Sequence, residues 1–194
     1  MGPRFILASG SPRRRQLLGA AGYEFEVLSP PVDEVAHGWL TIRELTTWNA
    51  ACKAARVSEM APNAVVLAAD TLVAIDGEVL GKPRDLKNAA QILRRLSGRA
   101  HEVWTSVRIN HHARRRSRSF HEMSRVHFRK LDDRAIRDYL AKIDPLDKAG
   151  AYAAQGHGAE IIERIEGSYT NVVGLPMEET VRALRTFGIE GGRR

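Results

Sequence analysis

The sequence predicts an α/β fold with a mixed, twisted central sheet flanked by helices. Three observations indicate this class: short apolar runs with the length of strands, longer segments with apolar residues at helical spacing, and turn residues between them. The chain has 194 residues, enough to bury a core, and we expect residues 1–194 to form a single domain. No segment approaches the roughly 18 consecutive apolar residues of a membrane span, so we expect no membrane partner.

The first expected elements are a strand, a helix and a second strand. Residues 4–8 predict a short buried strand, and the residues that follow them are typical of a helix start. Ser11 is a good N-cap, Pro12 suits the first helical position, and Gly22 fits a C-terminal cap. Residues 25–28 then predict the second strand.

The next elements are a helix, a buried strand and a hairpin. Residues 41–58 are expected to form a helix because their apolar side chains share one side. Residues 65–69 form a continuous apolar run, as expected of a central strand covered on both faces, and we expect this strand to end at Asp70. The dipeptide Asp76-Gly77 is a strong turn signal and predicts a separate hairpin over residues 72–80.

The second half of the chain alternates between the same two kinds of pattern. Its expected elements are, in order, a helix over 85–97, strands over 101–109 and 120–130, a helix capped by Asp132, a glycine-rich turn segment over 144–159, a strand over 161–165 and a helix that starts at Pro176. The two long strands are joined by a basic tip, residues 111–121, which holds four arginines and no acid.

The net charge of +7 is concentrated in two places. The basic tip and the terminal Arg193-Arg194 hold six arginines together, so the remainder of the chain carries one excess positive charge. We therefore expect a solvated hairpin tip, and nucleic acid is not indicated as the main partner. The single Cys52 cannot form an internal disulfide, which favours a reducing compartment and a cytoplasmic location.

The turn from Ser9 through Gly10, Ser11 and Pro12 to Arg13 and Arg14 is a candidate phosphate site. Free backbone N–H groups and the helix dipole attract anions to the start of a helix. Cations are unfavourable in the first helical turn, which is understandable if both arginines bind an anion there. The alternative is an ordinary capped helix whose arginines point to solvent.

Carboxylates and lysines form the second candidate group. Asp70 ends an apolar strand, where open α/β sheets place their ligand sites, and Asp33-Glu34 follows another strand. With Lys53, Lys82 and the anion-binding turn, these carboxylates resemble a site for Mg²⁺ and phosphate. The alternatives are that Asp70-Thr71 caps a turn and that either lysine is a solvated surface group.

Recognisable sequence blocks extend along almost the whole chain. They are residues 7–14 (LASGSPRR), 33–34 (DE), 53–54 (KA), 68–71 (AADT), 81–83 (GKP), 96–98 (LSG) with His101, 147–152 (DKAGAY), 155–156 (QG), 167–169 (GSY) and 171–176 (NVVGLP). On these blocks the sequence resembles the Maf (septum formation protein) family of nucleotide pyrophosphatases. Residues 45–52 depart from the pattern that is usual in the family before the lysine.

The resemblance implies an activity and a set of site residues. The family hydrolyses nucleoside triphosphates between the α and β phosphates, with a divalent metal cation, Mg²⁺ or Mn²⁺, as cofactor. Asp70 matches the catalytic proton acceptor, and Glu34 matches a carboxylate that binds the metal together with Asp70. The expected substrate-binding residues are Ser9, Ser11, Arg13, Arg14, Lys53, Thr71, Lys82 and Gln155.

The resemblance also implies a preference among substrates. Arg13, Thr71 and Gln155 match positions associated with substrate choice, and the DKAGAY block followed by QG resembles the subgroup that acts on dTTP, UTP and modified pyrimidine nucleotides. We therefore expect a house-cleaning enzyme, a homodimer, and two lobes with the active-site cleft between them. Two alternatives stay open: a 7-methyl-GTP or broad-specificity pyrophosphatase of the same family, and a nucleotide- or nucleic-acid-binding regulator of cell division.

Overall fold

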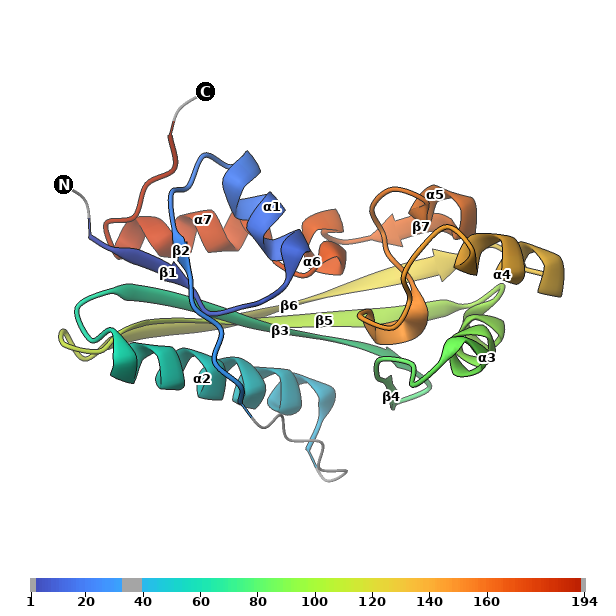
Figure 1. Cartoon of the computed structure of the whole chain (residues 1–194), viewed down its shortest axis with the longest axis horizontal. Helices are drawn as coiled ribbons and strands as arrows, with labels where there is room; N and C mark the ends of the chain where they lie inside the picture. Colours follow the sequence, from blue (N-terminus) through green and yellow to red (C-terminus); the bar gives the residue numbers. More distant parts are fainter. Residues whose placement is uncertain (1–2, 33–39, 193–194) are drawn as a thin grey trace. The chain divides into compact units, whose positions relative to one another are not determined.

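The computed structural model describes residues 3–32 and 40–192 and confirms the predicted α/β class (Figure 1). Seven strands of the described chain form one mixed sheet in the order β2-β1-β3-β5-β6-β7, and β4 pairs with β3. The strands are β1 (Phe5–Leu7), β2 (Glu26–Val27), β3 (Val65–Ile75), β4 (Glu78–Leu80), β5 (Ala100–His111), β6 (Arg116–Phe128) and β7 (Ile162–Glu166).

Seven α-helices and a short 3-10 helix accompany these strands in the described residues. They are α1 (Pro12–Ala20), α2 (Ile42–Met60), α3 (Leu86–Leu96), α4 (Asp133–Leu140), η1 (Ala149–Ala151), α5 (Gly158–Ile161), α6 (Tyr169–Val173) and α7 (Met177–Thr186). None of the helices in this part of the chain is both long and apolar enough to cross a membrane.

The chain divides into two compact units, and three strands contribute residues to both. Unit 1 comprises residues 1–70, 105–122 and 174–194, and unit 2 comprises residues 71–104 and 123–173. The boundaries fall within β3, β5 and β6. The two predicted lobes correspond to this division, whereas the predicted cleft and the single domain stay predictions.

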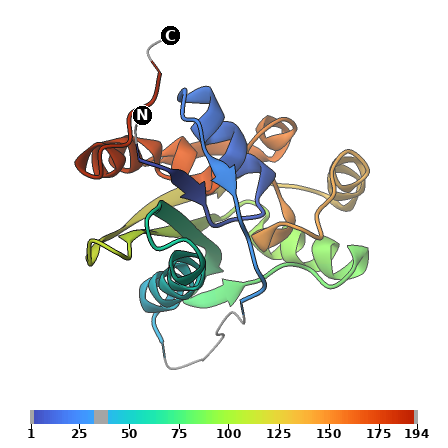
Figure 2. The same ribbon diagram turned by 60° about the vertical axis from the view of Figure 1, so that its left-hand side comes forward.

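Unit 1 has helices on both faces of its strands. On one face the strands pack against α1 and α7, and on the other they pack against α2 (Figure 1, Figure 2). The residues of β1 and the one after it show the alternation, because Phe5 and Leu7 belong to the first cluster and Ile6 and Ala8 to the second. Residues 65–69 of β3 are fully buried and alternate between the same two clusters, so the predicted burial of this central strand on both faces is confirmed.

The helix starts in unit 1 differ in how they are capped. Pro12 is the first residue of α1, as predicted, but the Ser11 hydroxyl makes no capping hydrogen bond. At α2, the Thr41 hydroxyl accepts the Glu44 N–H, and the Glu44 carboxylate accepts the Thr41 N–H. This reciprocal pair satisfies two backbone donors and fixes where α2 begins.

Unit 2 has its own hydrophobic core. The cluster includes Leu93 of α3, Tyr139 of α4 and Tyr152, which follows η1. The predicted hairpin is confirmed, because β4 pairs antiparallel with β3, and Asp76 and Gly77 have the positive φ angles, 54° and 77°, that its tight turn requires. β7 pairs antiparallel with β6.

Two predictions about element boundaries are wrong, and one helix was not predicted. β3 does not end at Asp70 but continues to Ile75, because the residues after Asp70 keep the apolar and β-branched character of a strand. β5 and β6 extend further into the basic tip than predicted, and the turn between them spans residues 112–115. α6 was not predicted, since three of its five residues are β-branched and disfavour a helix.

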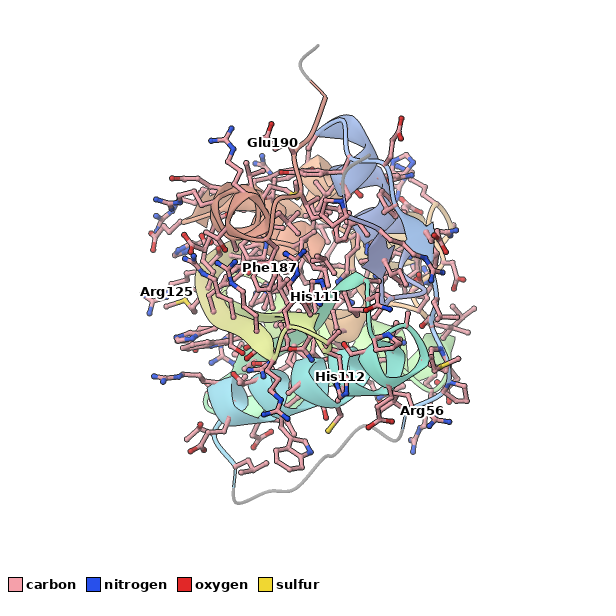
Figure 3. The ribbon with its side chains drawn as sticks, turned by 90° about the vertical axis from the view of Figure 1, so that its left-hand side faces the viewer. Arg56, His111, His112, Arg125, Phe187 and Glu190 are labelled. Atoms are coloured by element: carbon pink, nitrogen blue, oxygen red, sulfur yellow. The ribbon has the colours of Figure 1, made fainter. Side chains whose placement is uncertain are left out.

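The basic tip is mostly exposed, as predicted, although His111 is buried and two of its arginines contact the C-terminal part of unit 1. The guanidinium carbon of Arg116 lies 4.7 Å from the centroid of the Phe187 ring, which is labelled in Figure 3. Arg118 Nη2 lies 2.5 Å from Glu179 Oε1. Two of the four arginines of the tip therefore interact with other side chains of unit 1.

Candidate active site

Asp70 is a buried carboxylate inside β3, with 5% of its surface exposed. Its Oδ1 accepts a hydrogen bond from Lys53 Nζ at 2.7 Å, and its Oδ2 accepts one from Asn49 Nδ2 at 3.3 Å. Both partners belong to α2 and are four residues apart, so they lie on one side of that helix. A buried carboxylate requires such partners, and here they orient both oxygens. Because Asp70 lies within a strand, the alternative that it caps a turn is wrong.

Sheet pairing brings the Ser9–Arg14 turn close to Asp70. β1 and β3 are parallel, and the Ala8 N–H donates to the Leu67 carbonyl oxygen at 2.7 Å. Ser9 follows Ala8, and Asp70 lies three residues beyond Leu67, so both lie just beyond the last residues that pair β1 with β3. Unit 1 therefore contains both the helix-start turn and the acid–lysine pair, on two neighbouring strands and their flanking helices.

Ser9 and Arg14 fix the shape of this turn. Arg14 is buried, and its Nη1 donates to Ser9 Oγ at 3.0 Å while its Nε donates to the Gly174 carbonyl oxygen at 2.8 Å. Ser9 Oγ also accepts the Ser11 N–H at 3.3 Å. The alternative that both arginines point to solvent is therefore wrong for Arg14, and its contact with substrate stays a prediction.

Ser11 and Arg13 lie at the start of α1 and are partly exposed. The Ser11 hydroxyl does not cap the helix, so it accepts no hydrogen bond from the first backbone N–H groups of α1. Such a helix start can accept an anion, and Arg13 lies in its first turn. Binding of phosphate by Ser11 and Arg13 stays a prediction.

The remaining predicted residues belong to unit 2. Thr71 follows Asp70 within β3, Lys82 is exposed after β4, and Gln155 is half-buried in the segment between η1 and α5. The Gly150 N–H donates to the Gly81 carbonyl oxygen at 3.2 Å. This bond links the segment that carries Lys82 to the segment that carries Gln155.

Gly150 permits a close approach within unit 2. It has a φ of +73°, and a Cβ there would lie 3.1 Å from both methyl groups of Val73 and 3.2 Å from Cε1 of Tyr152. A larger residue would therefore be strained in its backbone and would also displace neighbours. The tight packing fixes the segment just before Gln155.

Two contacts of these regions were not predicted. Asn49 binds Asp70, and its position four residues before Lys53 on one helix was the available signal. His101 Nε2 lies 2.8 Å from the Tyr152 hydroxyl, and 51 residues separate the two, so no local pattern indicates the pair. Burial lowers the pKa of His101 to about 3, with a smaller contribution from His127, and the imidazole is neutral.

The predicted metal site can be described only in part. Glu34 and its neighbour Asp33 lie outside the described residues, and no group of three or more His, Cys, Asp or Glu within the described chain is arranged to hold a metal ion. The Asp70 carboxylate is a hard oxygen donor of the kind that Mg²⁺ and Mn²⁺ prefer. Because Mg²⁺ commonly takes about one or two carboxylates together with substrate phosphates, Asp70 fits one position of such a site.

Comparisons with known proteins cover nearly the whole chain. A family model described as Maf-like protein matches residues 4–187. A protein of Pelotomaculum thermopropionicum named dTTP/UTP pyrophosphatase is 46% identical over 94% of this chain and 96% of its own length. A protein of Bacillus pumilus with the same name is 44% identical over 96% of this chain and 97% of its own length. The solved structure of the Staphylococcus aureus Ham1 protein matches 64% of this chain and 71% of that chain, with 14% identity and a TM-score of 0.48.

Proposed function

The chain belongs to the family of Maf-like proteins, and from this premise we propose that it is a nucleoside triphosphate pyrophosphatase. It hydrolyses the bond between the α and β phosphates and releases a nucleoside monophosphate and pyrophosphate. The proposed substrates are dTTP, UTP and modified pyrimidine nucleotides, and the names of the relatives support the first two. Removal of modified nucleotides would be a house-cleaning role.

The observation that carries the proposal is the environment of Asp70. An ammonium group and a carboxamide both donate hydrogen bonds to its carboxylate and orient its two oxygens, which are the atoms that would accept a proton. In the proposed reaction Asp70 takes a proton from a water molecule while the water oxygen bonds to the α-phosphorus. The bond from that phosphorus to the bridging oxygen breaks, and pyrophosphate leaves with the electron pair.

The other proposed roles concern positioning and charge. Cleavage of a phosphoanhydride depends mainly on holding the phosphates in place and neutralising their charge. Arg13, Lys53 and Lys82 are the proposed cations for the triphosphate, and Ser11 is a proposed hydrogen-bond donor to it. The hydrogen bonds of Arg14 to Ser9 and Gly174 support a role in shaping the turn, and binding of the substrate by Arg14 is a separate proposal.

We propose a divalent cation, Mg²⁺ or Mn²⁺, as cofactor. Asp70 and Glu34 would hold it, and when bound it would neutralise negative charge on the substrate phosphates. Each carboxylate oxygen of Asp70 retains a lone pair beyond the one used by Lys53 or Asn49, so ligation is compatible with the contacts that the structure describes.

Gln155 is the proposed determinant of pyrimidine preference, together with Arg13 and Thr71. Its carboxamide offers one donor group and one acceptor, the complement that the edge of uracil or thymine requires. The homodimer and the cytoplasmic location stay predictions, and light scattering of the purified protein would test the first.

A pyrophosphate-release assay tests the proposed function. We expect release from dTTP and UTP with Mg²⁺ or Mn²⁺, and a loss in kcat of about 100-fold to 10,000-fold in the Asp70→Asn variant. The variant keeps the size of the side chain, and its circular dichroism should match that of the parent protein.

The panel of substrates separates the alternatives. If no nucleoside triphosphate releases pyrophosphate, the proposed pyrophosphatase activity is refuted. Faster release from 7-methyl-GTP, or equal release from purines and pyrimidines, would refute the substrate preference and leave the reaction intact.

A further inference from the structure

Three of the four tyrosines of the chain support one short segment, residues 152–154, just before Gln155: Tyr139 and Tyr169 bond to its backbone, and Tyr152 belongs to it and bonds to His101. The Tyr152 hydroxyl lies 2.8 Å from His101 Nε2. The Tyr139 hydroxyl accepts the Ala153 N–H at 3.1 Å and donates to the Ala153 carbonyl oxygen at 3.4 Å. The Tyr169 hydroxyl donates to the Ala154 carbonyl oxygen at 3.4 Å. Three successive residues are therefore each held by a tyrosine hydroxyl, all within unit 2.

The strongest of these bonds lie in the core of unit 2. Tyr139, Tyr152 and His101 expose 1%, 6% and 2% of their surfaces. The rings of His101, Phe128 and Tyr152 pack edge to face, with centroid separations of 4.9 to 5.3 Å. Because rotation of any of these rings would disturb the others, the backbone at residue 152 has little freedom.

The segment has no other regular support. Residues 152–157 belong to neither a helix nor a strand, so no ladder of backbone hydrogen bonds fixes the position of Gln155. A carboxamide that distinguishes bases must be held within about half an ångström of its productive position. In this segment, hydrogen bonds of tyrosine hydroxyl groups restrain the backbone, as a ladder of backbone hydrogen bonds does in a helix or strand.

We propose that Tyr139, Tyr152 with His101, and Tyr169 are positioning residues that set the carboxamide of Gln155 for recognition of the pyrimidine base. This inference rests on the proposed function, in which Gln155 contacts the base. The hydroxyl groups act through the backbone of residues 152–154 and do not touch substrate. Their loss should therefore change the choice of substrate while leaving the hydrolytic step at Asp70 unchanged.

The test compares tyrosine-to-phenylalanine variants, which lose only a hydroxyl group. For Tyr139→Phe and Tyr152→Phe we expect the KM for dTTP to rise about threefold to tenfold with kcat nearly unchanged, so that the preference for dTTP over dGTP falls by the same factor. Tyr169→Phe should have a smaller effect in the same direction, because its bond is long and its ring is 47% exposed. Tyr169→Phe also keeps the test valid if a buried variant folds poorly.

The fourth tyrosine supplies the matched control. Tyr23 is as buried as Tyr152 but belongs to unit 1, where its ring packs against Phe5. Tyr23→Phe should leave the preference for dTTP over dGTP unchanged. A control variant that lowers this preference as much as the unit 2 variants do would overturn the proposal, because the effect would then follow from the loss of any tyrosine hydroxyl.

A double-mutant cycle with Gln155→Ala shows whether the tyrosines act through this residue. If they do, Tyr139→Phe and Tyr152→Phe will lower the preference in the parent protein but not in the Gln155→Ala background. Additive effects would overturn the positioning role. If Gln155→Ala alone leaves the preference intact, both the base contact and this inference fail, whereas failure of the pyrophosphatase itself would appear as no release from any nucleotide.

Discussion

The environment of Asp70 in unit 1 and the segment before Gln155 in unit 2 are both tightly held, but by different forces. Asp70 is held by a charged partner, Lys53, at 2.7 Å, and by Asn49. The segment before Gln155 is held by neutral groups, chiefly the hydroxyls of two buried tyrosines. The first arrangement is suited to a group that exchanges a proton and neutralises phosphate charge, and the second to a group that must only be placed.

The ionisation behaviour of the two regions differs accordingly. Burial raises the pKa of both Tyr139 and Tyr152, and it lowers the pKa of His101 to about 3. At neutral pH the supports of Gln155 therefore carry no charge. The support of Asp70 is an ion pair whose side chains are only 18% and 8% exposed. A substitution that removes a charge should therefore disturb the environment of Asp70 severely. The supports of Gln155 should be disturbed only in acid, where His101 becomes protonated.

The largest expected effect is that of Lys53→Met, which removes the charged partner of Asp70. We expect kcat/KM to fall by about 100-fold, because a positive group that contacts the proposed catalytic carboxylate is lost. We also expect the free energy of unfolding to fall by about 2–3 kcal/mol, since an almost buried carboxylate loses its ion-pair partner. Steady-state kinetics and urea unfolding measure the two effects.

A second variant separates these two effects. Lys53→Met combined with Asp70→Asn removes both charges, so most of the lost stability should return while activity stays absent. If the double variant is no more stable than Lys53→Met alone, the stability of unit 1 does not depend on this ion pair.

The second expected effect is a loss of stability in acid that originates at His101. Its pKa is about 3 in the folded protein and near the ordinary 6.5 when the chain is unfolded. Above pH 6.5 the imidazole is neutral in both states, and His101 does not reduce the free energy of unfolding. As the pH falls from 6.5 towards 3, the unfolded chain takes up a proton that the folded protein rejects, and stability falls by at most about 1.4 kcal/mol per pH unit.

Replacement of His101 by a residue that does not titrate tests this assignment. His101→Gln can still form a hydrogen bond with Tyr152, and we expect it to flatten the pH dependence of the free energy of unfolding between pH 6.5 and 3. His112→Gln changes an exposed histidine of the basic tip and serves as the control. An equal slope in both variants would show that the acid sensitivity arises elsewhere.

Sequence patterns predicted the local elements of both units but not the contacts between residues far apart in the chain. The sequence alone indicated α2, the buried run of β3 and the hairpin at Asp76-Gly77, because capping residues, apolar runs and turn dipeptides are local signals. The candidate residues Asp70 and Lys53 were predicted as well, and the structure joins them. Contacts between distant residues leave no such pattern. Arg14 and Gly174 are 160 residues apart, and His101 and Tyr152 are 51 apart.

The third expected effect tests how tightly the segment before Gln155 is packed. Gly150→Ala should lower the free energy of unfolding by about 1–3 kcal/mol, because alanine is strained at a positive φ and its Cβ would press on Val73 and Tyr152. Gly77→Ala is a matched control, since Gly77 also has a positive φ, +77°, but has open space around it. The difference between the two variants in urea unfolding isolates the packing contribution, and equal losses would contradict a packed segment.

The last expected effect distinguishes two serines of the turn in unit 1. Ser9→Ala removes the acceptor of hydrogen bonds from Arg14 and from the Ser11 backbone, so we expect a loss of about 1–3 kcal/mol in the free energy of unfolding. Ser11→Ala should change stability by less than about 0.5 kcal/mol, because its hydroxyl makes no capping bond.

The kinetic effects of the two serine variants complete this distinction. If Ser11 binds phosphate, Ser11→Ala will raise the KM for dTTP about threefold to tenfold without a loss of stability. The exposed Ser117 of the basic tip supplies the control, Ser117→Ala, which should alter neither quantity. A destabilised Ser11→Ala protein with an unchanged KM would show that Ser11 supports the fold, and the phosphate site of unit 1 would then depend on backbone N–H groups and arginines alone.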